Sequence, residues 1–112
     1  MADTITFDDF LRADLRVGTV RSAEPNPKAR NPAFVLTIDF GPLGMRTSSA
    51  QLTERYAADD LVGRQVVAVV NFPPKRVAGV KSEVLVLGAV DEAAGTTLLA
   101  PTHPVADGTR VA

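Results

Sequence analysis

The sequence predicts one all-β domain with short helices, built as a small barrel. Apolar and polar residues alternate in several short segments, and glycine and proline separate these segments from one another. Only two stretches have the helical spacing of apolar residues, and both are short. A chain of 112 residues with 46% hydrophobic residues buries one core and is too short for two. We therefore expect a single domain over residues 1–112, with a barrel over about 15–91 and a C-terminal extension over 92–112.

The first expected elements are a helix over about 7–13 and a strand over 15–23. Thr6 followed by Asp9 is typical of a capping box at a helix start. The strand alternates, but Gly18 in its middle weakens it unless the sheet bends sharply there or another backbone comes close. An apolar stripe that would pack on the barrel or on a partner consists of Phe7, Phe10 and Leu11.

A loop over 24–32 and a β-hairpin come next. The loop contains three prolines, which cannot donate to a strand ladder. The hairpin joins strands over 34–40 and 45–50 through a glycine-rich turn over 41–44. One face of its first strand is expected to be buried and carries Phe34, Leu36, Ile38 and Phe40.

The second half is expected to hold a helix over about 52–61 and a strand over 65–72. The strand is almost continuously apolar, which is typical of a central strand covered on both faces. A basic loop over 75–82, an apolar run over 84–90 and a short edge strand over 96–100 follow. This order, with a helix between the third and fourth strands, is that of a five-stranded OB-fold barrel, although other small β-barrels fit the periodicity almost as well.

The sequence offers little for catalysis or metal binding. It has no cysteine, and its one histidine, His103, lies between prolines near the end of the chain. Neighbouring carboxylates occur only in three pairs, and adjacent acids on helices or turns point apart. We therefore expect no enzyme activity, no metal site and no cofactor.

Nothing in the sequence indicates a membrane span or an export signal. The longest apolar run, over 66–70, has five residues against the roughly 20 that span a bilayer. The first ten residues are acidic and lack the apolar stretch of a signal peptide. We expect a cytoplasmic protein without membrane insertion.

The net charge of −1 hides an uneven distribution along the chain. Residues 1–14 carry a charge of −3 and residues 91–112 a charge of −2, whereas the segment between them carries +4. A basic middle in a slightly acidic chain indicates an anionic partner for that segment, such as nucleic acid.

The most informative segment is 71–83, where two prolines precede three cations. Lys75, Arg76 and Lys81 lie in a loop that the flanking strands would hold at the barrel rim. A stiff loop loses little entropy on binding, so its cations can converge on a phosphate. The alternative interpretation is a turn that these cations merely keep hydrated.

Two other segments add polar groups to this surface. Residues 46–51 offer an arginine, hydroxyls and an amide, and their alternative role is an edge strand that ends in a helix N-cap at Thr53. The proline-rich loop adds Lys28 and Arg30. Base stacking is disfavoured, because Phe72 is the only aromatic residue not assigned to the core or a helix. A folded RNA recognised by charge and shape fits these residues better.

Several motifs resemble a known family. Asp14-Leu15-Arg16-Val17-Gly18 and the pattern Asn71-x-x-Pro74-x-Arg76-x-x-Gly79-x-x-Ser82-Glu83 are similar to the tRNA-binding OB domain found at the C-terminus of many methionyl-tRNA synthetases and as free-standing dimers. The segments RTSSAQ, VVNFPP and GVKSEVLVLG resemble more closely the CsaA family, the bacterial stand-alone branch described as secretion chaperones. The similarity covers about residues 7–105. Val84-Leu85 stands where synthetase domains have Gly-Met, and this departure is CsaA-like.

The resemblance implies an OB-fold homodimer with a basic surface for tRNA or another structured RNA. In the CsaA branch it also implies a hydrophobic pocket for unfolded preprotein segments, and hence contact with the secretion machinery. Carried onto this chain, the implied nucleic-acid-binding residues are Arg46, Ser48, Ser49, Gln51, Asn71, Pro74, Lys75, Arg76, Gly79, Lys81, Ser82 and Glu83.

Two functional hypotheses remain open on the sequence. The first is an RNA-binding module that uses the basic rim. The second is a chaperone that holds extended segments on exposed apolar groups, with Phe72 and Val77 as the candidate peptide-binding residues. A homodimer would use the stripe of the first helix together with Leu98 and Leu99, and the alternative for these residues is packing within one chain.

Overall fold

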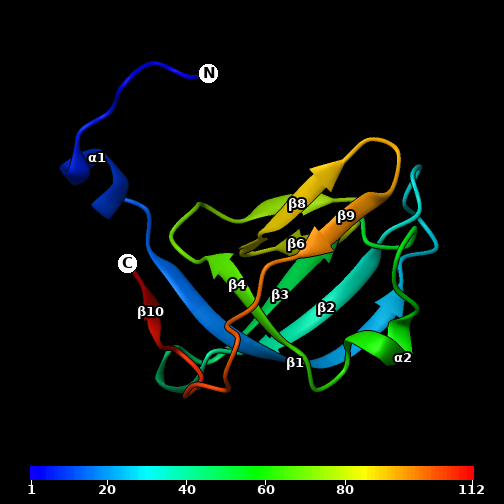
Figure 1. Cartoon of the computed structure of the whole chain (residues 1–112). Helices are drawn as coiled ribbons and strands as arrows, with labels where there is room; N and C mark the ends of the chain where they lie inside the picture. Colours follow the sequence, from blue (N-terminus) through cyan, green and yellow to red (C-terminus); the bar gives the residue numbers. More distant parts are fainter.

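The computed structural model describes all residues, 1–112, and shows one curved antiparallel sheet (Figure 1). Five strands follow the order β3-β2-β1-β4-β7, and β10 pairs with the first two residues of β1. The strands are β1 (Leu15–Pro25), β2 (Phe34–Asp39), β3 (Met45–Ala50), β4 (Gln65–Val69), β7 (Leu85–Val86) and β10 (Arg110–Val111). The Glu83 N–H donates to the Thr47 carbonyl (2.7 Å), which brings β3 against the segment before β7 and nearly closes the barrel. The expected all-β OB-type barrel is confirmed.

Two small hairpins and two short helices complete the chain. One hairpin joins β5 (Lys75–Val77) to β6 (Val80–Ser82), and the other joins β8 (Gly88–Asp91) to β9 (Gly95–Leu98). The helices are α1 (Phe7–Leu11), which precedes the barrel, and α2 (Ala58–Leu61), which lies between β3 and β4 as expected. A 3-10 turn, η1 (Gly41–Leu43), connects β2 to β3. None of these helices is long and apolar enough to cross a membrane.

The core forms where the alternating pattern of β2 predicts it. All four expected side chains, Phe34, Leu36, Ile38 and Phe40, are buried. The core leaves no room for a side chain at Gly18 of β1, because a Cβ there would lie 2.7 Å from Ile38 Cγ2 and 2.8 Å from the Phe40 ring. The close neighbours of Gly18 are core side chains, not the second backbone that the sequence pattern predicts.

The strand β4 is buried on both faces, as its apolar run predicts. Val66 and Ala68 belong to the main core, whereas Val67 and Val69 belong to a smaller apolar cluster on the other side of the sheet. Phe10 of α1 packs against this second cluster. The capping box at the start of α1 is also confirmed, since the Asp9 N–H donates to Thr6 Oγ1 (3.1 Å) and the Thr6 N–H donates to Asp9 Oδ2 (3.1 Å).

The helix expected over 52–61 is wrong in its first half. Only Ala58–Leu61 is helical, because Ala57 has an extended backbone (φ −88°, ψ 157°) that interrupts the turn formed after Leu52. Thr53 therefore caps no helix. The first helix is also shorter than expected and ends at Leu11.

The basic loop expected over 75–82 is a regular β-hairpin. Its two-residue turn consists of Ala78 (φ 48°) and Gly79 (φ 83°), the left-handed pair that matches the twist of antiparallel strands. The apolar run over 84–90 is divided at Leu87 into β7 and β8, and the expected edge strand begins at Gly95 rather than Thr96. The tail is irregular up to residue 109 and then pairs with β1.

Candidate nucleic-acid interface

Two side-chain contacts fix the β5–β6 hairpin on β3. The Ser49 N–H donates to Ser82 Oγ (3.1 Å), and the Thr47 N–H donates to Glu83 Oε1 (3.1 Å). These bonds satisfy amides of β3 on the side away from β2. Ser82 and Glu83 thus hold the hairpin in a fixed orientation at the barrel surface.

The register of this hairpin divides its cations between two faces. Lys75 lies opposite Ser82, Arg76 opposite Lys81, and Val77 opposite Val80. Directly opposed residues of antiparallel strands project to the same face, and successive residues project to opposite faces. Lys75 and Val77 therefore share one face, whereas Arg76 and Lys81 share the other. The sequence predicts that the three cations form one group. The structure instead divides them between the two faces of the hairpin.

A cation of the proline-rich loop lies beside the hairpin turn. Arg76 Nη1 donates to the Gly79 carbonyl (3.2 Å), and Lys28 Nζ lies 3.9 Å from the position that a Cβ on Gly79 would take. Asn26 is buried, and its side-chain amide donates to the Ala78 carbonyl (3.4 Å), which ties the loop to the turn. We call Lys28, Arg76 and Lys81 the tip cluster.

No carboxylate neutralises the tip cluster. The chain has three ion pairs within 4.0 Å, and all of them involve Arg16 or Arg21 on β1. Lys28, Arg76 and Lys81 are exposed and form no ion pair. Their charges are therefore free to act on a ligand.

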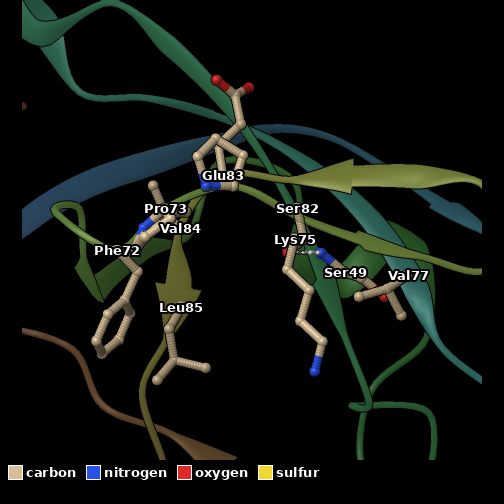
Figure 2. Close-up of a pocket in the computed structure, with 10 residues that line it drawn as sticks. Ser49, Phe72, Pro73, Lys75, Val77, Ser82, Glu83, Val84 and Leu85 are labelled. Atoms are coloured by element: carbon tan, nitrogen blue, oxygen red, sulfur yellow. Dashed lines mark hydrogen bonds between the residues drawn. The ribbon is translucent and has the colours of Figure 1, made fainter.

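The opposite face of the hairpin borders a pocket of about 570 Å³, which we call the Phe72 pocket (Figure 2). Phe72 is 53% exposed and Leu85 is 50% exposed, and both line it. Lys75 is the only cation among the lining residues. In Figure 2 its side chain extends to the same side as the Phe72 ring and Leu85, whereas the carboxylate of Glu83 points the other way. The full lining is Ser49, Phe72, Pro73, Pro74, Lys75, Val77, Ser82, Glu83, Val84 and Leu85.

Two of the expected RNA-binding residues make side-chain hydrogen bonds within the chain. Ser48 is 1% exposed, and its hydroxyl donates to the Val84 carbonyl (3.1 Å). Ser48 is therefore a core residue, and the prediction that it contacts a ligand is wrong. Asn71 accepts from the Asp14 N–H (2.9 Å) through Oδ1 and donates to the Arg12 carbonyl (2.7 Å) through Nδ2. The side-chain oxygen and nitrogen of Asn71 thus both bind the segment that connects α1 to β1.

Three other expected residues do not belong to the tip cluster. Arg46 lies at the start of β3, where Nη2 donates to the Leu43 carbonyl (3.1 Å) of the β2–β3 connection. Gln51 lines a groove whose other members include three carboxylates, those of Glu54, Asp91 and Glu92. Arg30 is exposed in the proline-rich loop and forms no ion pair.

Sequence reasoning missed Leu85 and Asn26. The sequence analysis predicts only an apolar run over 84–90, yet Val84 is buried (4% exposed) whereas its neighbour Leu85 is 50% exposed. Val84 precedes β7, so the alternation of sides within a strand does not predict this difference. Nothing local in the sequence indicates that Asn26 reaches a turn 52 residues further along the chain.

A family model described as "Putative tRNA binding domain" matches residues 15–110. The chain belongs to this family of tRNA-binding domains. Among its relatives, the methionine–tRNA ligase of Porphyromonas gingivalis is 40% identical over 111 residues, which cover 99% of this chain and 16% of that protein. The methionine–tRNA ligase of Salinibacter ruber is 44% identical over 96 residues, which cover 86% of this chain and 13% of that protein. The matched part thus spans 13% to 16% of these two ligases.

Two solved structures match this chain, and the match covers the whole length of each of them. The chaperone CsaA from Bacillus anthracis is 58% identical, with a TM-score of 0.93 and coverage of 98% of this chain and 100% of that one. The CsaA chaperone protein from Picrophilus torridus is 43% identical, with a TM-score of 0.91 and coverage of 97% and 100%. The chain is therefore a tRNA-binding domain of the CsaA type, as its motifs indicate.

Proposed function

We propose that the chain binds tRNA or another structured RNA through the tip cluster, with Arg30 as a neighbouring contact. The observation that carries this proposal is the absence of a carboxylate partner for Lys28, Arg76 and Lys81 in a chain whose net charge is −1. Phosphate contacts supply most of the affinity in RNA and DNA binding. The family description is one of binding rather than of catalysis.

The rigidity of the hairpin supports phosphate binding. Ser82 and Glu83 fix its base on β3, and Asn26 fixes its turn. Side chains on such a frame lose less conformational entropy when they bind than side chains on a mobile loop. Phe34, Phe40 and Tyr56 are occupied in packing, so few rings can stack on bases. Recognition of RNA shape through phosphates follows from this composition.

The test is a tRNA titration at several salt concentrations. Three to four phosphate contacts per chain give a slope of log K against log salt between about −2 and −3.6. Replacement of two contacting cations, Arg76→Ala with Lys81→Ala, reduces the slope by about 1.4 to 1.8. The matched control is Arg12→Ala with Arg55→Ala, which removes the same charge from exposed positions outside the hairpin. Absence of tRNA binding at low salt, or an equal loss in the control, contradicts the proposal.

A second function is favoured by the Phe72 pocket. We propose that it holds extended apolar segments of unfolded proteins, as expected for a chaperone of the secretion pathway. Phe72 and Leu85 expose apolar surface there, with Val77 beside them, and two related structures are named as chaperones. The test is the aggregation rate of an unfolded client protein, which the chain should lower and the Phe72→Ala variant should not. Equal protection by the variant would contradict this function.

We also propose a homodimer. In the single chain, Phe7 is 69% exposed and Leu11 is exposed beside it, so the stripe of α1 is only partly covered through Phe10. Leu99 is likewise exposed, whereas Leu98 packs against the core. Sedimentation of the chain and of the Phe7→Ser variant tests this: the first should give a dimer and the second a weaker one. A monomer for the unmodified chain would refute it.

A further inference from the structure

We infer that the tip cluster and the Phe72 pocket are separate sites on opposite faces of one hairpin, so that the chain holds an RNA and an apolar peptide segment at the same time. This inference rests on the proposed functions and adds how the two ligands share the surface. It also assigns Lys75 to the peptide rather than to the RNA.

The hairpin register carries the first step. Lys75, Val77 and Ser82 project to one face and line the pocket, whereas Arg76 and Lys81 project to the other face and do not line it. The backbone of β5 and β6 therefore stands between the two ligands. An RNA held by the tip cluster need not enter the pocket to be bound.

The direction of the Lys75 side chain indicates which peptide the pocket selects. This side chain lines the Phe72 pocket and extends to the same side as Phe72 and Leu85 (Figure 2). Lys75 forms no ion pair, and Glu83, the carboxylate among the lining residues, accepts the Thr47 N–H and points away. A cation without a partner beside apolar side chains selects a ligand with a carboxylate next to an apolar group. The matching ligand is an extended peptide with an acidic residue beside a leucine-like one.

Charge places a limit on how independent the two sites can be. Lys75 and Arg76 are adjacent in β5 but point to opposite faces, so salt screens the pocket from phosphates at the tip cluster to a large extent, because the Debye length at physiological salt is about 8 Å. Bound RNA should therefore repel an acidic peptide slightly without displacing it. We expect a change in peptide affinity of no more than about threefold, and a smaller one at higher salt.

The experiment measures both ligands on the same protein. A fluorescein-labelled decapeptide of leucine, alanine and one aspartate is titrated by anisotropy, with and without saturating tRNA, and the aspartate is replaced by asparagine in a second peptide. Peptide affinity should survive saturation with tRNA, and the complex should carry both ligands in sedimentation. Lys75→Ala should weaken the aspartate peptide severalfold and leave the asparagine peptide and the salt slope for tRNA unchanged.

Two sets of variants separate the sites. Phe72→Ala and Leu85→Ala should each lower peptide affinity at least tenfold and leave tRNA binding intact, and both positions are half exposed, so folding is preserved. Arg76→Ala with Lys81→Ala should do the reverse. Displacement of peptide by tRNA, or loss of tRNA binding in the Phe72→Ala variant, overturns the separation while leaving the proposed RNA binding in place. Failure of the unmodified chain to bind tRNA or the peptides overturns the corresponding proposed function and the separation with it.

Discussion

Replacement of Asn71 by alanine separates a structural role from an RNA contact. The side chain makes two hydrogen bonds to backbone groups, 2.9 Å from the Asp14 nitrogen and 2.7 Å to the Arg12 carbonyl oxygen. Each such bond contributes about 0.5 to 1.5 kcal/mol, and the exposed position favours the lower half of this range. The loss of both should weaken the attachment of α1 by about 1 to 2 kcal/mol. A helix of five residues cannot maintain itself in water, so its local stability depends on such attachments.

Hydrogen exchange at the Asp14 and Phe10 amides measures this effect. A loss of 1 to 2 kcal/mol corresponds to exchange that is faster by a factor of about 5 to 30. Asn31→Ala is the matched control, because that exposed asparagine makes no side-chain hydrogen bond, and it should change neither exchange nor binding. Affinity of Asn71→Ala for tRNA should stay within about twofold. Unchanged exchange together with a large loss of tRNA affinity would refute the reasoning and make Asn71 an RNA contact.

Three further changes have expected outcomes. Gly18→Ala forces a methyl group to within 2.8 Å of the Phe40 ring, and urea denaturation should show a loss of about 1 to 3 kcal/mol; unchanged stability would mean that the core yields there. Asp107→Ala removes the acceptor of the Thr19 hydroxyl (2.6 Å) and should lower the free energy of unfolding by about 1.5 to 3 kcal/mol in the same assay, with a loss below 0.5 kcal/mol as the contrary result. Ala78→Asn and Ala78→Asp should both reduce the backbone strain of the left-handed conformation at position 78 and raise the free energy of unfolding by about 0.5 to 1 kcal/mol. Only the aspartate should weaken tRNA binding, with the difference shrinking at high salt, and equal binding by the two variants would contradict the role of the tip cluster.

The strands were predictable where burial imposes a simple period. The alternation of 34–40 places its four large side chains in the core, and the unbroken run of β4 marks a strand with apolar groups on both faces. Gly18 was predictable only in part, since a glycine inside a strand indicates a crowded position, whereas its neighbours are the Ile38 and Phe40 side chains and not a second backbone. The alternation and the apolar run follow from the geometry of a single strand and need no knowledge of its neighbours.

The site was less predictable because it depends on how segments pair. Lys75, Arg76 and Lys81 form one group in the sequence, yet the hairpin register separates the first from the other two. Ser48 is adjacent to Ser49, but one is buried and the other lines the pocket. A shift of one residue in either strand would exchange these roles. Sequence patterns therefore predict which residues gather on the hairpin and β3, whereas the face that each one occupies is fixed only by pairing.

The free charge at the hairpin turn results from where the carboxylates lie rather than from the total charge. Asp14, Asp39 and Asp107 pair with arginines of β1, and the carboxylate of Glu83 accepts a backbone amide. Three more carboxylates line the groove beside Gln51, a residue that does not belong to the tip cluster. Screening at physiological salt limits the reach of each exposed charge to about 8 Å, so a bound phosphate responds to its local neighbours. A chain with a net charge of −1 can therefore attract a polyanion at one turn, and a change of charge at a distant position should leave that attraction intact.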